Sequence, residues 1–270
     1  MPFLWIVGRT FLSNLVRRRA LLLNLVMRDF QQRYVGSAVG WLWGGVQPAV
    51  LLLSYTFVFG RIFQVKPPTD SRTSSFALWL FAGIVPWLLF QEAVQRSVTA
   101  VVDYSNLITK TMFPSEMLPL AMFLSGLINH ALALVVLLVI AGIAGTLTPL
   151  ALLLPLYLLL LALFSVGISW VVSSLHVFLR DTSHAFSIVL IFWFWFTPIF
   201  YTADRLPRRL HFLARVNPLA YVVEAYRGLV GAGPAPRVAD LGLLALFALG
   251  VFFAGGLFFR YTKRAFGDVL

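Results

Sequence analysis

A polar stretch that leads into a long apolar run decides the fold of this chain. Residues 28–48 read RDFQQRYVGSAVGWLWGGVQP, and apolar residues then continue to Phe63. The first part is charged and amphipathic, Gly36 and Ser37 form a joint, and the second part begins with two tryptophans and contains Pro48. Tryptophan is enriched where a protein crosses the membrane–water interface. The stretch predicts a chain that runs along a bilayer surface and then turns into it.

The composition of the whole chain agrees with a membrane location. The chain has 270 residues, of which 60% are hydrophobic and 11% are charged, whereas soluble domains carry about 25% charged residues. The apolar runs are long and continuous, which predicts an all-α helical bundle rather than a β-barrel of short alternating segments. The net charge of +11 suits anionic lipid at a cytoplasmic membrane face. It does not indicate nucleic acid, because the basic residues lie at the ends of apolar runs.

The apolar runs predict one transmembrane domain over residues 1–270 with six spans. Residues 1–36 show the periodicity of an amphipathic helix lying in the interface. The spans are expected at about residues 40–60, 76–93, 118–145, 150–178, 183–201 and 241–259. Residues 97–116 form the most polar internal stretch. Residues 202–240 mix charged and apolar residues, which predicts two short helices separated at Asn217 and Pro218.

The positions of lysine and arginine predict the orientation. A narrow majority of them lies on the side of the two termini, which predicts that both termini are cytoplasmic. The opposite side holds an unusual concentration of arginines in residues 202–240. A segment that folds back into the membrane interface would explain that concentration.

A search for catalytic motifs is negative. The chain has no cysteine and lacks the phosphate-binding Gly-Lys-Ser/Thr loop, the zinc motif His-Glu-x-x-His and the nucleophile motif Gly-x-Ser-x-Gly. We expect no catalytic residue and no metal site. Glu92, at the end of the second expected span, is the carboxylate nearest to a span interior, which argues against proton-driven transport. A carrier without its own energy source requires a partner, and residues 97–116 are the best candidate for docking a soluble ATPase.

A series of short motifs along the chain carries a family resemblance. The motifs are Arg28-Asp29 and Arg33-Tyr34, Gly36-Ser37-x-x-Gly40-x-x-Trp43, Tyr55-x-x-Val58-Phe59-Gly60, Gly83-x-x-Pro86-Trp87, Asn106-Leu107-Ile108-x-Lys110, Phe113-Pro114-x-Glu116-x-x-Pro119, Phe178-x-Arg180-Asp181, Thr197-Pro198-Ile199-x-Tyr201, and Asn217-Pro218 ahead of Arg227. In order and spacing they resemble the membrane subunits of polysaccharide ABC exporters. These subunits belong to the type-2 ABC exporter class, which handles O-antigen, capsular polysaccharide and teichoic acid.

The resemblance implies an assembly and a substrate. It implies a homodimer bound to two ATPase subunits, which would hold ATP and Mg, so that this chain carries no cofactor of its own. The substrate would be a polysaccharide on an undecaprenyl-pyrophosphate type of lipid, moved across the bacterial cytoplasmic membrane. The loop between spans two and three would be a coupling helix against the ATPase, and short re-entrant helices between spans five and six would form an outer gate.

Two sets of residues are the candidates for substrate contacts. Sugars stack their CH faces on aromatic rings, so an aromatic path suits a moving polymer, and its candidates are Trp41, Trp43, Tyr55, Phe59, Trp193, Trp195 and Tyr201. The forked guanidinium of arginine matches phosphate oxygens, so Arg28 and Arg33 are candidates for the pyrophosphate head group. The alternative for these two arginines is anchoring to anionic lipid.

Two further sets concern the partner and the gate. The candidates for ATPase coupling are Asp103, Tyr104, Asn106, Leu107, Lys110, Phe113, Glu116, Arg180 and Asp181. The candidates for the outer gate are Arg205, Arg208, Arg209, Asn217, Pro218 and Arg227.

Two other functions remain open at this point. One is an ABC permease for a drug or a small lipid, which the motif at the first span and the aromatic content disfavour. The other is a membrane-embedded lipid-sugar transferase. That enzyme would need a cluster of carboxylates or histidines at one membrane face, and the sequence shows none.

Overall fold

A computed structural model describes residues 18–65, 67, 71, 73, 75–110, 113–203 and 207–270. The described residues form helices and no strand, which confirms the all-α prediction. Five helical stretches are long and apolar enough to cross a membrane, at Gly40–Ile62, Phe76–Asp103, Met117–Ile143, Pro149–Phe178 and Val238–Ala265. Where the fifth of the six spans is expected, at about residues 183–201, a shorter apolar helix covers Thr182–Phe196.

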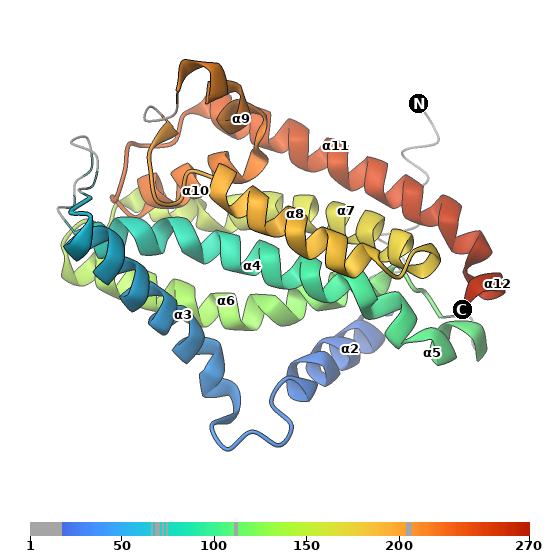
Figure 1. The fold of residues 1–270 in the computed structure, drawn as a ribbon. Coiled ribbons are helices and arrows are strands. Elements are labelled where there is room, and N and C mark those ends of the chain that lie inside the picture. The colour runs from blue at the N-terminus through green and yellow to red at the C-terminus, as the bar shows by residue number, and fades with distance from the viewer. Residues whose placement is uncertain are drawn as a thin grey trace.

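Figure 1 shows how the helices are arranged. In chain order they are α2 (Arg19–Gln32), η1 (Gly40–Leu42), α3 (Trp43–Tyr55), η2 (Thr56–Ile62), α4 (Phe76–Asp103), α5 (Ser105–Lys110), α6 (Met117–Ile143), η3 (Pro149–Leu153), α7 (Leu154–Phe178), α8 (Thr182–Phe196), η5 (Arg208–Leu210), α9 (His211–Val216), α10 (Pro218–Leu229), α11 (Val238–Thr262), η6 (Lys263–Ala265) and α12 (Phe266–Val269). Helices α5 and α12 lie at one end of the bundle, and α9 and α10 lie at the other.

Helix α4 is the centre of the bundle and packs against α6, α7, α8 and α10. Its first half, residues 76–90, is apolar on all sides, as expected of a helix surrounded by others. The Ser75 hydroxyl caps its first turn by accepting a hydrogen bond from the Leu78 N–H. The helix does not end near residue 93 but continues to Asp103, because Val94, Val98 and Val101 remain buried. The first third of the polar stretch 97–116 is therefore part of α4.

Helices α7 and α11 approach each other at two glycines. A Cβ atom on Gly255 would lie 2.2 Å from the Gly167 carbonyl oxygen, and a Cβ on Gly167 would lie 2.6 Å from the Val251 carbonyl oxygen. Small residues allow this kind of backbone contact between membrane helices. Helix α11 is thereby fixed against α7 along a contact that no larger side chain would permit.

Helix α3 diverges from the bundle, and with α2 it forms a V whose point is the connection between them (Figure 1). No residue of α3 is buried. The connection needs glycine at two positions, because Gly36 has a φ of 77° and Gly40 a φ of 61°. Open space surrounds both glycines, so the backbone conformation, and not the lack of room, requires them. The joint expected at Gly36 and Ser37 lies at this point.

Candidate functional site

A large cavity lies between the diverging α3 and the bundle. Its volume is about 860 Å³, and its wall comes from the two residues that follow α2 and from α3, α4, α6 and α8. Its lining includes polar residues, namely Arg33, Gln47, Gln91, Glu92, Gln95, Arg96, Asn129 and His130, and aromatic residues, namely Tyr34, Trp43, Tyr55, Trp87, Phe194 and Trp195. The cavity combines ring faces with amide and charged groups, which suits a ligand rich in hydroxyls.

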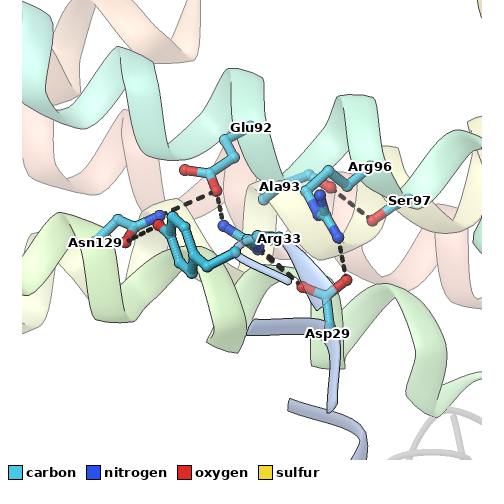
Figure 2. A network of polar contacts seen from close by, with 8 residues as sticks. Asp29, Arg33, Glu92, Ala93, Arg96, Ser97 and Asn129 are labelled. Carbon is cyan, nitrogen blue, oxygen red and sulfur yellow. Dashed lines mark hydrogen bonds and ion pairs between the residues drawn. The ribbon is translucent and has the colours of Figure 1, made fainter. Parts of the chain in front are cut away.

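A network of charges fixes α2 to α4 at the polar wall of this cavity (Figure 2). The Arg33 guanidinium donates to Asp29 Oδ2 over 2.9 Å and also ion-pairs with Glu92. Arg96 ion-pairs with the other oxygen of Asp29. Asn129 on α6 donates to Glu92 over 3.4 Å. Two carboxylates thus hold two arginines, and the end of α2 is bound to the middle of α4.

The carboxyl group of Asp29 is the centre of this network and is almost completely buried. Burial by itself raises the pKa of Asp29. The neighbouring Ser125 hydroxyl and the positive charges of Arg96 and Arg33 outweigh that effect, so the pKa lies below its usual value of 3.8. Asp29 is therefore a carboxylate at neutral pH, which makes it a permanent acceptor for both arginines.

The two arginines proposed for a phosphate head group have different surroundings. The Arg33 side chain is only 7% exposed and is held by two carboxylates. Arg28 lies on the exposed side of α2, with its guanidinium carbon 5.7 Å from the centroid of the Tyr104 ring. Arg33 is thus engaged inside the protein, while Arg28 makes no ion pair with any residue in the described ranges.

The structure places three of the seven aromatic path candidates in the cavity wall: Trp43, Tyr55 and Trp195. Each of the other four lies elsewhere. The Trp193 indole donates to Asn217 Oδ1 over 2.9 Å, the Phe59 ring stacks on Phe200 at 4.7 Å, the Tyr201 hydroxyl donates to the Trp195 carbonyl, and Trp41 is exposed outside the cavity.

Several cavity residues were missed by the reasoning from sequence. They are Trp87, Gln91, Glu92 and Gln95 on α4, with Asn129 on α6. The signal was present, because Gln91, Glu92, Gln95 and Arg96 recur at helical spacing after an apolar run. In sequence these residues resemble the polar end of a span, whereas α4 continues for two further turns and contains them.

Three of the gate candidates, Asn217, Pro218 and Arg227, fix the position of α10. Asn217 caps the helix by accepting from the Leu219 N–H at 3.1 Å, its amide donates to Thr197 over 2.9 Å, and Pro218 occupies the first turn. Arg209 is exposed. Arg205 and the side chain of Arg208 lie outside the described residues.

Arg227 is fully surrounded by protein. Its guanidinium donates to the carbonyl oxygens of Trp79, Pro198 and Ile199 at 3.2, 2.8 and 2.5 Å and lies 3.7 Å from the centroid of a Trp79 ring. A Cβ atom on Gly83 would lie 2.6 Å from its Nη2, so this glycine of α4 makes the room for it. Arg227 connects α10 to α4 and to the turn after α8.

The coupling candidates divide into exposed and buried groups. Asp103, Asn106, Lys110, Arg180 and Asp181 are exposed, Tyr104 and Leu107 are half-buried, and Phe113 is buried. Glu116 is engaged inside the protein, because Lys263 Nζ lies 2.5 Å from its carboxylate and the Trp170 indole donates to its carbonyl over 3.0 Å. The exposed members lie on α5, at the end of α4 and in the turn between α7 and α8.

Residues 20–230 match the family of ABC-2 type transporters, and the chain therefore belongs to this family. Among its relatives, the O-antigen export system permease protein RfbA of Myxococcus xanthus is 28% identical over 261 residues, which cover 94% of this chain and 97% of the relative. The protein of the same name from Klebsiella pneumoniae is 25% identical, with 93% and 95% of the two chains covered. The polysialic acid transport protein KpsM of Escherichia coli is 25% identical, with 89% and 93% covered.

Proposed function

We propose that this chain is the channel-forming transmembrane subunit of an ATP-driven exporter of a lipid-linked polysaccharide, an O-antigen or a capsule. Two copies of the chain would combine with two ATPase subunits in the bacterial cytoplasmic membrane, with both termini in the cytoplasm. The polysaccharide would be carried on an undecaprenyl-pyrophosphate type of lipid. The names of its relatives, an O-antigen permease and a polysialic acid transport protein, support this substrate class.

The lining of the large cavity is the observation that carries the proposal. A sugar has apolar CH faces and polar hydroxyl groups, and this cavity offers the half-exposed rings of Trp43 and Trp195 together with the side-chain amides of Gln91 and Gln95. A permease for an apolar drug or a small lipid would gain little from several amide and charged groups, since each must lose water when the ligand enters.

The exposed residues on α5 and in the turn between α7 and α8 support an ATPase partner. They lie on loops and short helices at the end of the bundle opposite α9 and α10 (Figure 1). Lys110, Arg180 and Asp181 extend from this end into solvent, where a soluble subunit can reach them. ATP and Mg would be bound by that subunit.

The test is to replace the gene by variants in the organism and to measure polysaccharide at the cell surface. The double variant Trp43→Ala with Trp195→Ala removes two stacking faces from the cavity, and we expect export to fall at least about tenfold, because each aromatic contact is worth on the order of 1 kcal/mol. Trp41→Ala is the matched control, because Trp41 is similarly exposed but lies outside the cavity.

Two outcomes would contradict different parts of the proposal. Export that survives the double variant in a correctly assembled complex contradicts the role of the cavity. Surface polysaccharide that persists when the gene is deleted contradicts the proposed function itself.

A further inference from the structure

A second, smaller pocket lies between α2 and the last turns of α4. Its volume is about 360 Å³, and its wall includes Arg28 and Gln32 of α2, Arg96 and Thr99 of α4, and Tyr104 just after α4. Arg96 also lines the large cavity. One guanidinium therefore lies in the wall that the two spaces share.

The pocket contains hydrogen-bond donors that have no acceptor. The Nε atom of Arg96 and the hydroxyl of Tyr104 are both buried, and neither has a hydrogen-bond partner among the described residues. Arg96 uses only Nη2 in its ion pair with Asp29. A buried donor without an acceptor is destabilising and therefore rare in folded proteins. These atoms mark a position where a ligand with acceptor oxygens would satisfy them.

The pocket also offers positive charge. Arg28 is exposed, and its guanidinium carbon lies 5.7 Å from the centroid of the Tyr104 ring, which keeps it at the pocket wall. Within the described part of the chain it makes no ion pair. Arginine presents donors in a planar fork that matches two oxygens of a phosphate group. Arg28 therefore provides such a fork to the pocket, and Arg96, whose Nη2 pairs with Asp29, adds its positive charge and its unpartnered Nε donor.

We infer that this pocket binds the phosphate groups of an anionic ligand, with Arg28 and Arg96 as the cations and Tyr104 as a neutral donor. Arg33, the other arginine proposed for a head group, does not line this pocket and is held by two carboxylates, Asp29 and Glu92. Arg96 lines the pocket and pairs with Asp29 alone. The identity of the ligand rests on the proposed function: under that function, the ligand is the pyrophosphate head group of the lipid-linked polysaccharide. Its sugars would then extend past Arg96 into the large cavity.

One carboxylate in the pocket opposes the anion. Asp103 accepts a hydrogen bond from the Thr99 hydroxyl at 2.7 Å and is not ion-paired with any described residue. Asp29, in contrast, is compensated by Arg33 and Arg96. The repulsion from Asp103 lowers the affinity of the pocket for phosphate, which suits a transport protein because the head group must leave again.

The position of Tyr104 links the pocket to the coupling segment. Tyr104 is the cap of α4, and α5 begins at the next residue, Ser105. A phosphate held between Arg28 and Tyr104 would bridge α2 to the start of α5. Occupancy of the pocket is therefore expected to slow the amide hydrogen exchange of residues 105–110.

Binding can be measured with the full-length chain in nanodiscs of phosphatidylcholine, with farnesyl pyrophosphate as the probe. We expect Arg28→Gln to weaken binding about tenfold and Tyr104→Phe about threefold, since the first loses charge-assisted hydrogen bonds and the second a neutral one. Asp103→Asn should tighten binding about threefold. The matched control is Arg19→Gln, an equal loss of charge at an exposed position of α2 outside the pocket.

The opposite effects of Arg28→Gln and Asp103→Asn separate binding from misfolding, because a damaged protein does not bind more tightly. Equal affinity of the Arg28→Gln and Arg19→Gln variants for the probe would overturn the proposal that this pocket binds phosphate. An unchanged affinity in Asp103→Asn would do the same. So would unchanged exchange in residues 105–110 when the probe is added to the wild type.

Competition distinguishes the sources of the phosphate. Displacement of the probe by inorganic pyrophosphate but not by farnesol supports recognition of the anion. Displacement by phosphatidylglycerol added to the nanodiscs would identify a membrane lipid as the ligand and overturn the assignment to the substrate. These measurements need neither the ATPase nor export, so they remain valid even if the gene proves not to serve polysaccharide export.

Discussion

The helical stretch Gly40–Ile62, which contains α3, and helix α4 are both apolar enough to span a membrane, but their surroundings differ completely. Most side chains of α4 are buried among α6, α7, α8 and α10. No residue of α3 is buried, and large side chains such as Val50 and Leu53 are more than half exposed. Hydropathy thus identifies a span without telling what surrounds it. The divergence of α3 from the bundle is also what leaves room for the large cavity.

The contrast predicts the largest effect inside the bundle, at the contact between α7 and α11. In Gly255→Leu, the side chain would collide with the backbone at Gly167. We expect a loss of folding stability on the order of 3 kcal/mol or more, measured as the yield of monodisperse protein and as thermal unfolding. Gly250→Leu is the matched control, because open space surrounds Gly250 on the same helix. Equal yields would show that the helices are not in backbone contact.

The next effect concerns Arg227, which connects α10 to α4. Arg227→Met removes the donor from three carbonyl groups, those of Trp79, Pro198 and Ile199. Each buried acceptor that loses its partner costs about 1 kcal/mol or more, so we expect a loss of about 3 kcal/mol. Arg209→Met, in an exposed part of the same segment, should leave the unfolding temperature unchanged. A similar shift in both variants would argue that the charge, and not the buried hydrogen bonds, matters.

A pair of identical substitutions tests the comparison directly. Leu80→Ala in α4 opens a cavity at a fully buried site, whereas Leu53→Ala in α3 makes the same truncation at a site that is 70% exposed. Because lipid is as apolar as the bundle interior, only lost packing contributes, and we expect about 2 kcal/mol for Leu80 and close to zero for Leu53. Thermal unfolding measures both. Equal losses would show that a partner covers α3.

The sequence allowed the fold class and the apolar stretches to be predicted, because both follow from hydropathy and length. It did not show which side of a helix faces the cavity. Trp193 and Trp195 are two residues apart on α8, yet Trp195 lines the cavity and Trp193 donates to Asn217. Residues two apart on a helix point in different directions, and only the packing of α8 on α4 decides which one is free.

Charged residues were harder to place, because their roles depend on partners far away in the chain. Arg33 pairs with Glu92, which is 59 positions away, and Arg227 donates to the Trp79 carbonyl, which is 148 positions away. From the sequence, Arg33 is a candidate for the head group and Arg227 for the outer gate. In the structure, carboxylates of the protein hold Arg33, and backbone carbonyl groups of the protein accept hydrogen bonds from Arg227. Of the two head-group candidates, Arg28 is the one without an ion pair to a described residue, and this difference could be recognised only after the partners of Arg33 were known.

The smallest effect on bundle stability is expected at Asp29, because Asp29 fixes α2 and leaves the packing of α4, α7 and α11 unchanged. Asp29→Asn removes the negative charge that holds Arg33 and Arg96. We expect amide hydrogen exchange in α2 to rise about tenfold or more while the unfolding temperature of the bundle changes little. Asn24→Asp, a reverse exchange at an exposed position of α2, is the control.

The pKa of Asp29 gives the same test a pH dependence. Because the pKa in the folded state is lowered from 3.8, the carboxylate stabilises the attachment of α2 at pH values above 3.8, and this contribution is lost as the pH falls through the lowered pKa. Protection of α2 should therefore be constant between pH 5 and 7 in wild type and decline in acid, whereas Asp29→Asn should show no such decline. Protection that falls already between pH 7 and 5 would contradict this account, since only a group with a much higher pKa could then hold α2 against α4.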